Sequence, residues 1–109
     1  MQNSVTKHED NRRTLTEWIA NFPITTIKIL EVKEECELGN HYHKLKQDFF
    51  YLLKGKGTYV IGNEHGEIKV GDSLTARPFE VHTFFLKKGS ILLEASTTPY
   101  DKEDEISIA

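Results

Sequence analysis

Short stretches of alternating apolar and polar residues, rich in β-branched side chains, follow one another from residue 24 onward. The first, ITTIKILEV at 24–32, is typical of an extended strand. Similar runs predict further strands at 41–44, 48–54, 57–62, 67–70, 73–76, 81–87 and 90–96. Glycines between many of these runs mark turns. Short strands at this spacing predict an all-β domain, folded as a sandwich or a barrel.

The two ends of the chain have a different character. Residues 1–13 are polar and lack periodicity, so we expect a loose arm. Thr14 and Glu17 form a capping-box pattern, which predicts a short helix over 14–20. The acidic run at 101–105 predicts a solvated tail. The resulting division is an N-terminal arm and short helix at 1–23, a barrel at 24–96 and an acidic C-terminal tail at 97–109.

The strand predicted at 48–54 is apolar on both faces. Alternation places Phe50 and Leu52 on one face and Phe49 and Tyr51 on the other. A barrel by itself would expose its outer face to water, so something must cover these side chains. Either the predicted N-terminal helix or a second subunit can do so. We favour a homodimer to which the terminal segments contribute.

Composition narrows the class of protein. The chain has 109 residues, with 14 basic and 17 acidic side chains and a formal net charge of −3. It lacks the basic surplus of a nucleic-acid or membrane-surface binder, and no apolar run approaches the ~20 residues of a membrane span. One cysteine, Cys36, excludes an internal disulfide, and the first residues do not form a secretory signal. We expect a soluble cytoplasmic protein with no nucleic-acid or membrane partner.

Three histidines and an aspartate are placed to meet in the interior. His41 and His43 lie two residues apart in a predicted strand, so both project from the same face. His82 and Asp48 fall on the predicted core faces of their own strands, and Asp48 shares its face with Phe50. Imidazole and carboxylate ligands together suit zinc, nickel, iron, manganese or copper. The sequence therefore predicts a site for one divalent metal ion.

A ligand pocket is expected beside this site. The core faces of the same strands supply Phe50, Leu52 and Phe84 as candidate lining residues. Lys44 and Arg77 are candidates to attract an anionic ligand near the mouth, although solvated surface charges are the simpler interpretation. The expected partner is a small molecule.

The spacing of the metal-site residues resembles the first motif of the cupin family. That motif is a His-x-His, four residues, a glutamate, six residues and a glycine. Here His41, His43, Asp48 and Gly55 stand at those positions. Aspartate in place of glutamate is a departure from the family pattern, and its side chain is one methylene shorter.

The second cupin motif, with a glycine, a proline and a histidine, resembles Gly71, Pro78 and His82. The resemblance covers 24–96 and implies a cupin-type double-stranded β-helix, the jelly-roll barrel. It also implies that the metal ligands are His41, His43, Asp48 and His82.

A narrower resemblance involves 39–44, GNHYHK. This segment is similar to the cupin portion of reductases that make capsular-polysaccharide sugar nucleotides, and to 3,4-ketoisomerases that act on nucleotide-linked keto-sugars. Both groups usually carry an arginine where Leu38 stands, and arginine suits phosphate oxygens. The ketoisomerases use paired histidines without metal and have no carboxylate at the position of Asp48. That carboxylate favours metal binding here.

Three functions remain open at this point, and no residue is assigned as catalytic. The first is a small metal-binding cupin that presents its ion to a small molecule, either as a binding protein or as an oxygenase, isomerase or lyase. The second is a metal-free isomerase or epimerase of keto-sugar nucleotides, in which His41 and His43 shuttle protons. The third is a non-catalytic small-molecule-binding or sensory module.

Overall fold

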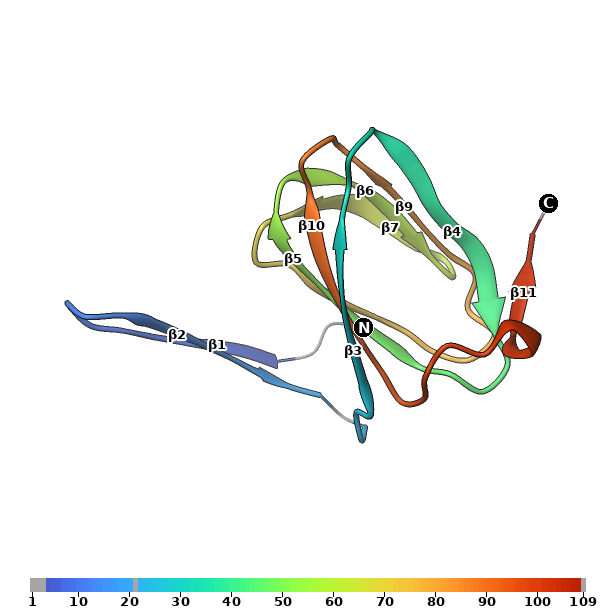
Figure 1. Cartoon of the computed structure of the whole chain (residues 1–109), viewed down its shortest axis with the longest axis horizontal. Helices are drawn as coiled ribbons and strands as arrows, with labels where there is room; N and C mark the ends of the chain where they lie inside the picture. Colours follow the sequence, from blue (N-terminus) through green and yellow to red (C-terminus); the bar gives the residue numbers. More distant parts are fainter. Residues whose placement is uncertain (1–3, 21, 109) are drawn as a thin grey trace.

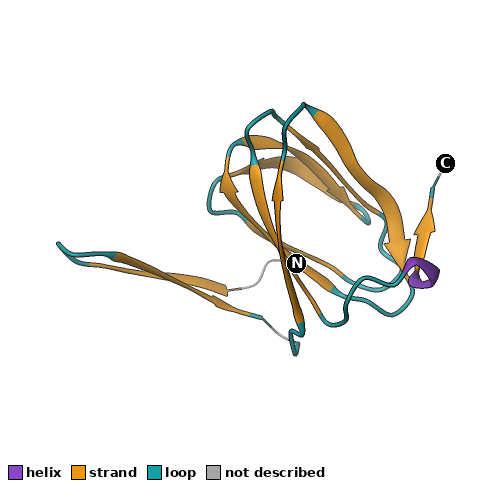
Figure 2. Ribbon diagram, viewed as in Figure 1, coloured by secondary structure: helices purple, strands orange, loops and turns teal. Residues whose placement is uncertain are grey.

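The chain folds into two β-sheets that face each other, with a separate hairpin at the N-terminal end (Figures 1 and 2). The computed structural model describes residues 4–20 and 22–108. Its elements are β1 (Ser4–Glu9), β2 (Thr14–Ile19), β3 (Thr26–Glu31), β4 (Cys36–His43), β5 (Asp48–Lys54), β6 (Lys56–Ile61), β7 (Glu64–Lys69), β8 (Ser73–Ala76), β9 (His82–Leu86), β10 (Ile91–Ser96), the 3₁₀ turn η1 (Lys102–Asp104) and β11 (Glu105–Ser107).

From β3 onward the chain passes back and forth between the two sheets, except that β6 and β7 are neighbours in the same sheet. One sheet has four strands in the order β3-β10-β5-β8, and the other has five in the order β11-β4-β9-β6-β7. The strand ladders are antiparallel. This alternation pairs strands that are distant in the sequence, such as β4 with β9 and β3 with β10. It is how residues from the first half of the chain meet residues from the second.

The prediction of an all-β fold is confirmed, whereas the prediction of a closed barrel is not. No strand ladder joins the two sheets within residues 4–20 and 22–108, so the body is an open sandwich. Apolar side chains from both sheets fill the space between them, among them Phe50, Leu52, Phe84 and Leu86. At Gly57 the backbone of β9 comes so close that an added Cβ would lie 2.1 Å from the carbonyl oxygen of Phe85. Glycine is therefore required there for β6 to pair with β9.

The predicted N-terminal helix is wrong, and within the expected loose arm residues 4–9 form strand β1, whereas residues 1–3 lie outside the described residues. Residues 14–19 form β2, which pairs with β1 in a hairpin that projects from the body in Figure 1. The two residues of the capping box bond across the hairpin instead of along a helix. Thr14 donates its hydroxyl to Glu9, and Glu17 accepts from the hydroxyl of Thr6. Pairing with a second strand thus overrides a local helix signal.

The base of this hairpin covers part of the outer face of the four-stranded sheet. Phe49, Tyr51 and Ala95 are buried in a second apolar cluster, against which Val5 and Trp18 pack. The ring centroids of Trp18 and Tyr51 are 5.0 Å apart, with one ring edge-on to the other. Of the two candidate covers for this face, the segment around Trp18 covers part of it, as a strand and not as a helix.

The acidic segment near the C-terminus is packed against the body and is not a solvated tail. Its β11 pairs with β4, and η1 precedes it. The carboxylate of Asp104 accepts hydrogen bonds from the backbone amides of residues 44, 45 and 46. Asp104 is 7% exposed. In the part of the chain that the structure describes, no helix is long and apolar enough to cross a membrane.

Candidate functional site

A bulge in β4 decides which way its histidines face. Gly39 and Asn40 have positive φ angles of 99° and 67°. The register of β4 against β9 shifts between Gly39 and His41. One extra residue in a strand exchanges the two faces for every residue that follows. As a result, Leu38 lines the interior before the bulge, and His41 and His43 line it after the bulge.

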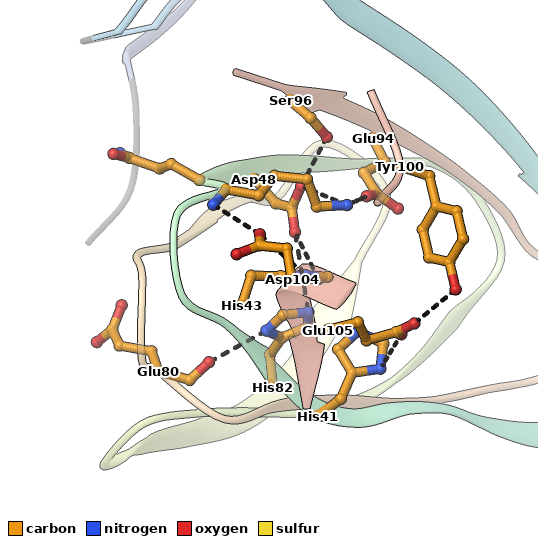
Figure 3. Close-up of polar contacts among 12 residues, drawn as sticks. His41, His43, Asp48, Glu80, His82, Glu94, Ser96, Tyr100, Asp104 and Glu105 are labelled. Carbon is orange, nitrogen blue, oxygen red and sulfur yellow. Dashed lines mark hydrogen bonds and ion pairs between the residues drawn. The ribbon is translucent and has the colours of Figure 1, made fainter. Parts of the chain in front are cut away.

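Three histidines converge at one end of the space between the sheets (Figure 3). His41 and His43 come from β4, and His82 is the first residue of β9. One ligand atom from each ring lies within 4.8 Å of the others. His43 and His82 are buried, and His41 is half-buried. The structure thus brings together the three histidines that the sequence singles out.

Each imidazole turns its Nδ1 atom toward an oxygen. The Nδ1 of His41 is 2.8 Å from Oε1 of Glu105, and the Nδ1 of His82 is 3.2 Å from the carbonyl oxygen of Glu80. The Nδ1 of His43 is 3.8 Å from Oδ2 of Asp104; it is buried and has no hydrogen-bond partner. Carboxylates and carbonyls only accept, so the ring proton lies on Nδ1 of His41 and His82. Their Nε2 lone pairs remain for a ligand in the cluster.

Asp48 faces the same point from the opposite sheet. Its Oδ2 is 3.7 Å from Nε2 of His43 and 3.9 Å from Nε2 of His82. Its Oδ1 accepts a 2.6 Å hydrogen bond from the hydroxyl of Ser96. Asp48 is 1% exposed. One oxygen of this carboxylate is therefore fixed by the protein, and the other is directed at two histidines.

A buried lysine accompanies this carboxylate. The Nζ of Lys46 is 3.4 Å from Oδ1 of Asp48 and 3.5 Å from Oε2 of Glu94. Lys46 is 3% exposed, so its ammonium group depends on these two partners for charge compensation. Glu94 also lies 3.9 Å from the Nζ of Lys28. The four side chains form a chain of alternating charge along one wall of the site.

Burial shifts the pKa values of the two inner histidines in the same direction. Burial, the charge of Lys46 and the neighbouring His41 lower the pKa of His43 to about 4. Burial lowers the pKa of His82 to about 4 as well, although its hydrogen bond to the Glu80 carbonyl acts in the opposite direction. Both rings are neutral at pH 7. A neutral imidazole can bind a metal ion or accept a proton.

The pKa values of two carboxyl groups near the histidines, Glu94 and Asp104, are shifted in opposite directions. Burial and the nearby charge of Asp48 raise the pKa of Glu94, while Lys46 and Lys28 oppose the rise. For Asp104, burial would raise the pKa, but hydrogen bonds from the amides of residues 46, 45 and 44 hold it below the usual value. Asp104 is thus a fixed negative charge behind His43.

The histidine cluster opens into a cavity of about 260 Å³. Phe50 and Phe84 line it, as the sequence predicts, but Leu52 is fully buried in the core instead. Lys44 and Arg77 are exposed and lie outside the lining. The remaining lining combines an apolar wall with charged groups: Lys28, Leu30, Leu38, Gly39, Lys46, Leu92, Glu94, Tyr100 and Glu105.

Sequence reasoning missed the charged residues that surround the histidines. For Glu94 a signal was present, because alternation within 91–96 places it on the face of Leu92, which is a core residue. For Glu105 there was no local signal. It contacts His41 only because the chain returns to β4 sixty residues later, and a run of acidic residues is usually a solvated face.

Comparison with known proteins adds a family and a set of structural relatives. The family model described as "Cupin domain" matches residues 28–94. Among curated proteins, none matches the chain significantly.

Solved structures of similar fold include enzymes of sugar nucleotides. The QdtA 3,4-ketoisomerase of Thermoanaerobacterium thermosaccharolyticum, a double mutant in complex with TDP, is 25% identical with a TM-score of 0.81, over 99% of this chain and 86% of that one. WlaRA, a TDP-fucose-3,4-ketoisomerase from Campylobacter jejuni, is 17% identical with a TM-score of 0.80, over 99% and 90%. ChmJ, a 3'-monoepimerase from Streptomyces bikiniensis in complex with dTDP-quinovose, is 16% identical with a TM-score of 0.83, over 98% and 67%.

Proposed function

Because this chain belongs to the cupin family, we propose that its interior histidines bind one divalent metal ion and present it to a small-molecule ligand. The ligands in this proposal are His41, His43, Asp48 and His82. One observation carries it: the Nδ1 atoms of the three rings face oxygens of the protein, while Nε2 of His43 and His82 faces Asp48. Metal-binding histidines almost always have such a partner on the second ring nitrogen.

The spacing and charge of the donors fit such an ion. A metal–nitrogen bond is about 2.1 Å long, so two nitrogen donors of one ion are at most about 4 Å apart. One donor atom from each of the three histidines lies within 4.8 Å of the others, which is close to this limit. In the part of the chain that the structure describes, the charged side chains that line the cavity or contact a histidine comprise two ammonium groups and four carboxylates: Lys28, Lys46, Asp48, Glu94, Asp104 and Glu105. A cation is favoured there.

A bound divalent ion would act as a Lewis acid toward an oxygen of the ligand. The protein's own residues supply the rest. The apolar wall, which includes Leu38 and Phe84, gives the ligand a dry surface and excludes water. Lys46 holds one oxygen of Asp48 and so leaves the other for the ion.

Metal binding is tested by elemental analysis and titration calorimetry on the purified protein. We expect about one ion per chain after dialysis, and a loss of affinity of more than about 100-fold in His43→Ala, beyond the 10- to 100-fold typical of outer-sphere partners. His65→Ala is the matched control, because His65 is exposed in the β6–β7 hairpin. An unchanged metal content in a variant lacking His41, His43 and His82 would contradict the proposal.

A second candidate function is the metal-free isomerisation or epimerisation of a keto-sugar nucleotide. The likeness to a 3,4-ketoisomerase bound to TDP, at 25% identity, supports it. In the isomerisation one of His41 and His43 takes a proton from the carbon beside the keto group, while the carbonyl oxygen gains a proton and an enediol forms. The other histidine then delivers a proton to the former carbonyl carbon, while the neighbouring hydroxyl loses its proton and becomes the new keto group. The low pKa of His43 keeps it neutral and able to accept a proton.

Isotope exchange distinguishes the two functions. A nucleotide-linked 4-keto-sugar is incubated in D₂O with the protein and a chelator, and deuterium at the neighbouring carbon is followed by NMR. Incorporation that survives the chelator and disappears in His43→Ala supports the isomerase. Binding of a compound without any turnover would instead support a non-catalytic binding module.

We also propose that the protein is a homodimer. Ile27 and Ile29 on the outer face of β3 are 68% and 55% exposed, and Leu15 and Ile19 are exposed on the hairpin. A two-stranded hairpin alone is marginally stable, and a second copy supplies a sheet on which it can pack. Light scattering should give twice the chain mass, and Ile27→Lys should give a monomer. Val60→Lys, on the outer face of the other sheet, is the control.

A cytoplasmic location remains part of this proposal. Cys36 is a free, exposed thiol, and such thiols stay reduced in the cytoplasm. Fractionation of cells that express the full protein is the direct test. Recovery in an extracellular or membrane fraction would contradict it.

A further inference from the structure

The C-terminal segment places a carboxylate directly behind His41. Pairing of β11 with β4 sets Glu105 opposite His43 and Ser107 opposite His41. From this position Oε1 of Glu105 lies 2.8 Å from Nδ1 of His41. Figure 3 marks this contact with a dashed line. This is the shortest of the contacts between the three Nδ1 atoms and their facing oxygens. Glu105, near the C-terminus, thus fixes the imidazole ring of His41 in β4.

Glu105 is itself held in place by a second residue of the same segment. The hydroxyl of Tyr100 donates a 3.0 Å hydrogen bond to Oε2 of Glu105. Each oxygen of the carboxylate therefore has its own partner, one from β4 and one from the loop before η1. Tyr100 and Glu105 both line the cavity. A carboxylate with both oxygens engaged has little freedom to rotate, so the ring that it bonds is fixed as well.

We infer that Glu105 is a positioning residue, which keeps the ring proton of His41 on Nδ1 and so leaves the lone pair of this ring on Nε2, and that Tyr100 holds Glu105 in this role. The hydrogen bond at one ring nitrogen determines which nitrogen is free to bind or react. Without Glu105, the His41 ring can rotate and exchange its proton between the two nitrogens. The part of this inference that concerns metal affinity rests on the proposed function, whereas the part that concerns the tautomer does not.

The tautomer is measured on metal-free protein by long-range ¹H–¹⁵N NMR of the imidazole groups at about pH 7.5. In the unmodified protein we expect His41 to carry its proton on Nδ1. In Glu105→Ala a substantial Nε2–H population should appear, while His82 keeps its Nδ1 proton because its acceptor is the Glu80 carbonyl. Glu103→Ala is the matched control, since Glu103 is an exposed carboxylate in the same segment. It should leave the His41 signals unchanged.

Metal affinity gives the second readout, with Zn²⁺ or Co²⁺ titrated into each variant. Loss of such an outer-sphere partner typically weakens binding by about 10- to 100-fold, which we expect for Glu105→Ala. Glu105→Gln keeps an acceptor oxygen and should recover part of that loss. Tyr100→Phe should have a smaller effect than Glu105→Ala, and Glu103→Ala should have none. Circular dichroism checks that each variant is folded. If Glu105→Ala does not fold, the comparison is made with Glu105→Gln.

The outcomes separate this inference from the proposed function. If the unmodified protein binds no metal but the His41 tautomer depends on Glu105, the metal proposal fails and the positioning role is supported. If Glu105→Ala retains the Nδ1–H tautomer of His41, the positioning role is overturned, whatever the metal affinity. Equal metal affinity in Glu105→Ala and Glu103→Ala would overturn the positioning role of Glu105 in metal binding.

Discussion

The two faces of the four-stranded sheet are equally buried at β5 but are held in different ways. On the inner face, Phe50 and Leu52 pack within a cluster to which both sheets contribute. On the outer face, Phe49 and Tyr51 are 2% and 5% exposed, yet the side chains that cover them from outside this sheet come from the hairpin and the segment after it. The inner face depends on the whole fold, and the outer face depends on one projecting element. Equal burial therefore does not mean equal sensitivity to mutation.

The largest difference should appear at acid pH, because the inner face of this sheet packs toward His43 and His82, which belong to the five-stranded sheet. Their pKa of about 4 lies below the unfolded value of 6.5, so the unfolded state binds more protons between these values. Stability is then full above about pH 6.5 and falls as the pH drops toward 4. Between about pH 7 and 4.5 we expect a loss on the order of 2 kcal/mol per histidine, measured by urea unfolding.

A variant in which both histidines are replaced by asparagine is the control for this acid sensitivity. Its free energy of unfolding should change much less over the same pH range. An equally steep loss in that variant would show that the inner face is not the source. Metal ions should oppose the loss in the unmodified protein, since they bind only the neutral rings.

Two neighbouring leucines test the inner face directly. Leu52 is fully buried, so Leu52→Ala should lower the free energy of unfolding by about 2 to 5 kcal/mol, through lost transfer energy and a cavity. Leu53 is 39% exposed, and Leu53→Ala should cost less than about 1 kcal/mol. Chemical denaturation of both variants gives the comparison. Similar losses would mean that the inner core is not the more constrained of the two faces.

The smallest and most local effect is expected on the outer face. Trp18→Ala should remove the cover from Tyr51 and cost about 1 to 2 kcal/mol, less than a fully buried tryptophan, because Trp18 is only half-buried. Proteolysis should become faster in the hairpin and not in the two sheets. Trp18→Phe keeps the ring and removes an indole N–H that has no partner, so its stability should change little. If Trp18→Ala made proteolysis faster in the two sheets as well, the hairpin would have to be counted as part of the main core.

Local sequence patterns were sufficient to predict much of the sandwich. The strands at 48–54 and 73–76 lie where short runs of mostly apolar residues predict them, and the parity of β5 correctly sets Phe50 toward the core. The three histidines could also be found from their spacing. These features depend on neighbours two residues apart, which a strand places on one face.

Features that depend on distant partners could not be found in this way. The pattern at Thr14 and Glu17 suits a helix cap and a cross-strand contact equally well, and only pairing with β1 decides between them. Asp104 and Glu105 look like solvated charges until the backbone amides of 44–46 and the ring of His41 are placed beside them. The open form of the sandwich depends on how strands distant in the sequence are paired.

The bulge at Gly39 and Asn40 makes the chemistry of this chain depend on a local backbone conformation. If residues 38–43 formed a regular strand without the bulge, strict alternation from Leu38 would turn both imidazoles of β4 outward and direct Tyr42 inward. An added Cβ at Gly39 would lie 2.7 Å from the carbonyl oxygen of His82, so a substitution there disfavours the bulged pairing. Every proposed ligand would still be encoded, and Gly39 therefore deserves as much weight as the histidines when relatives are compared.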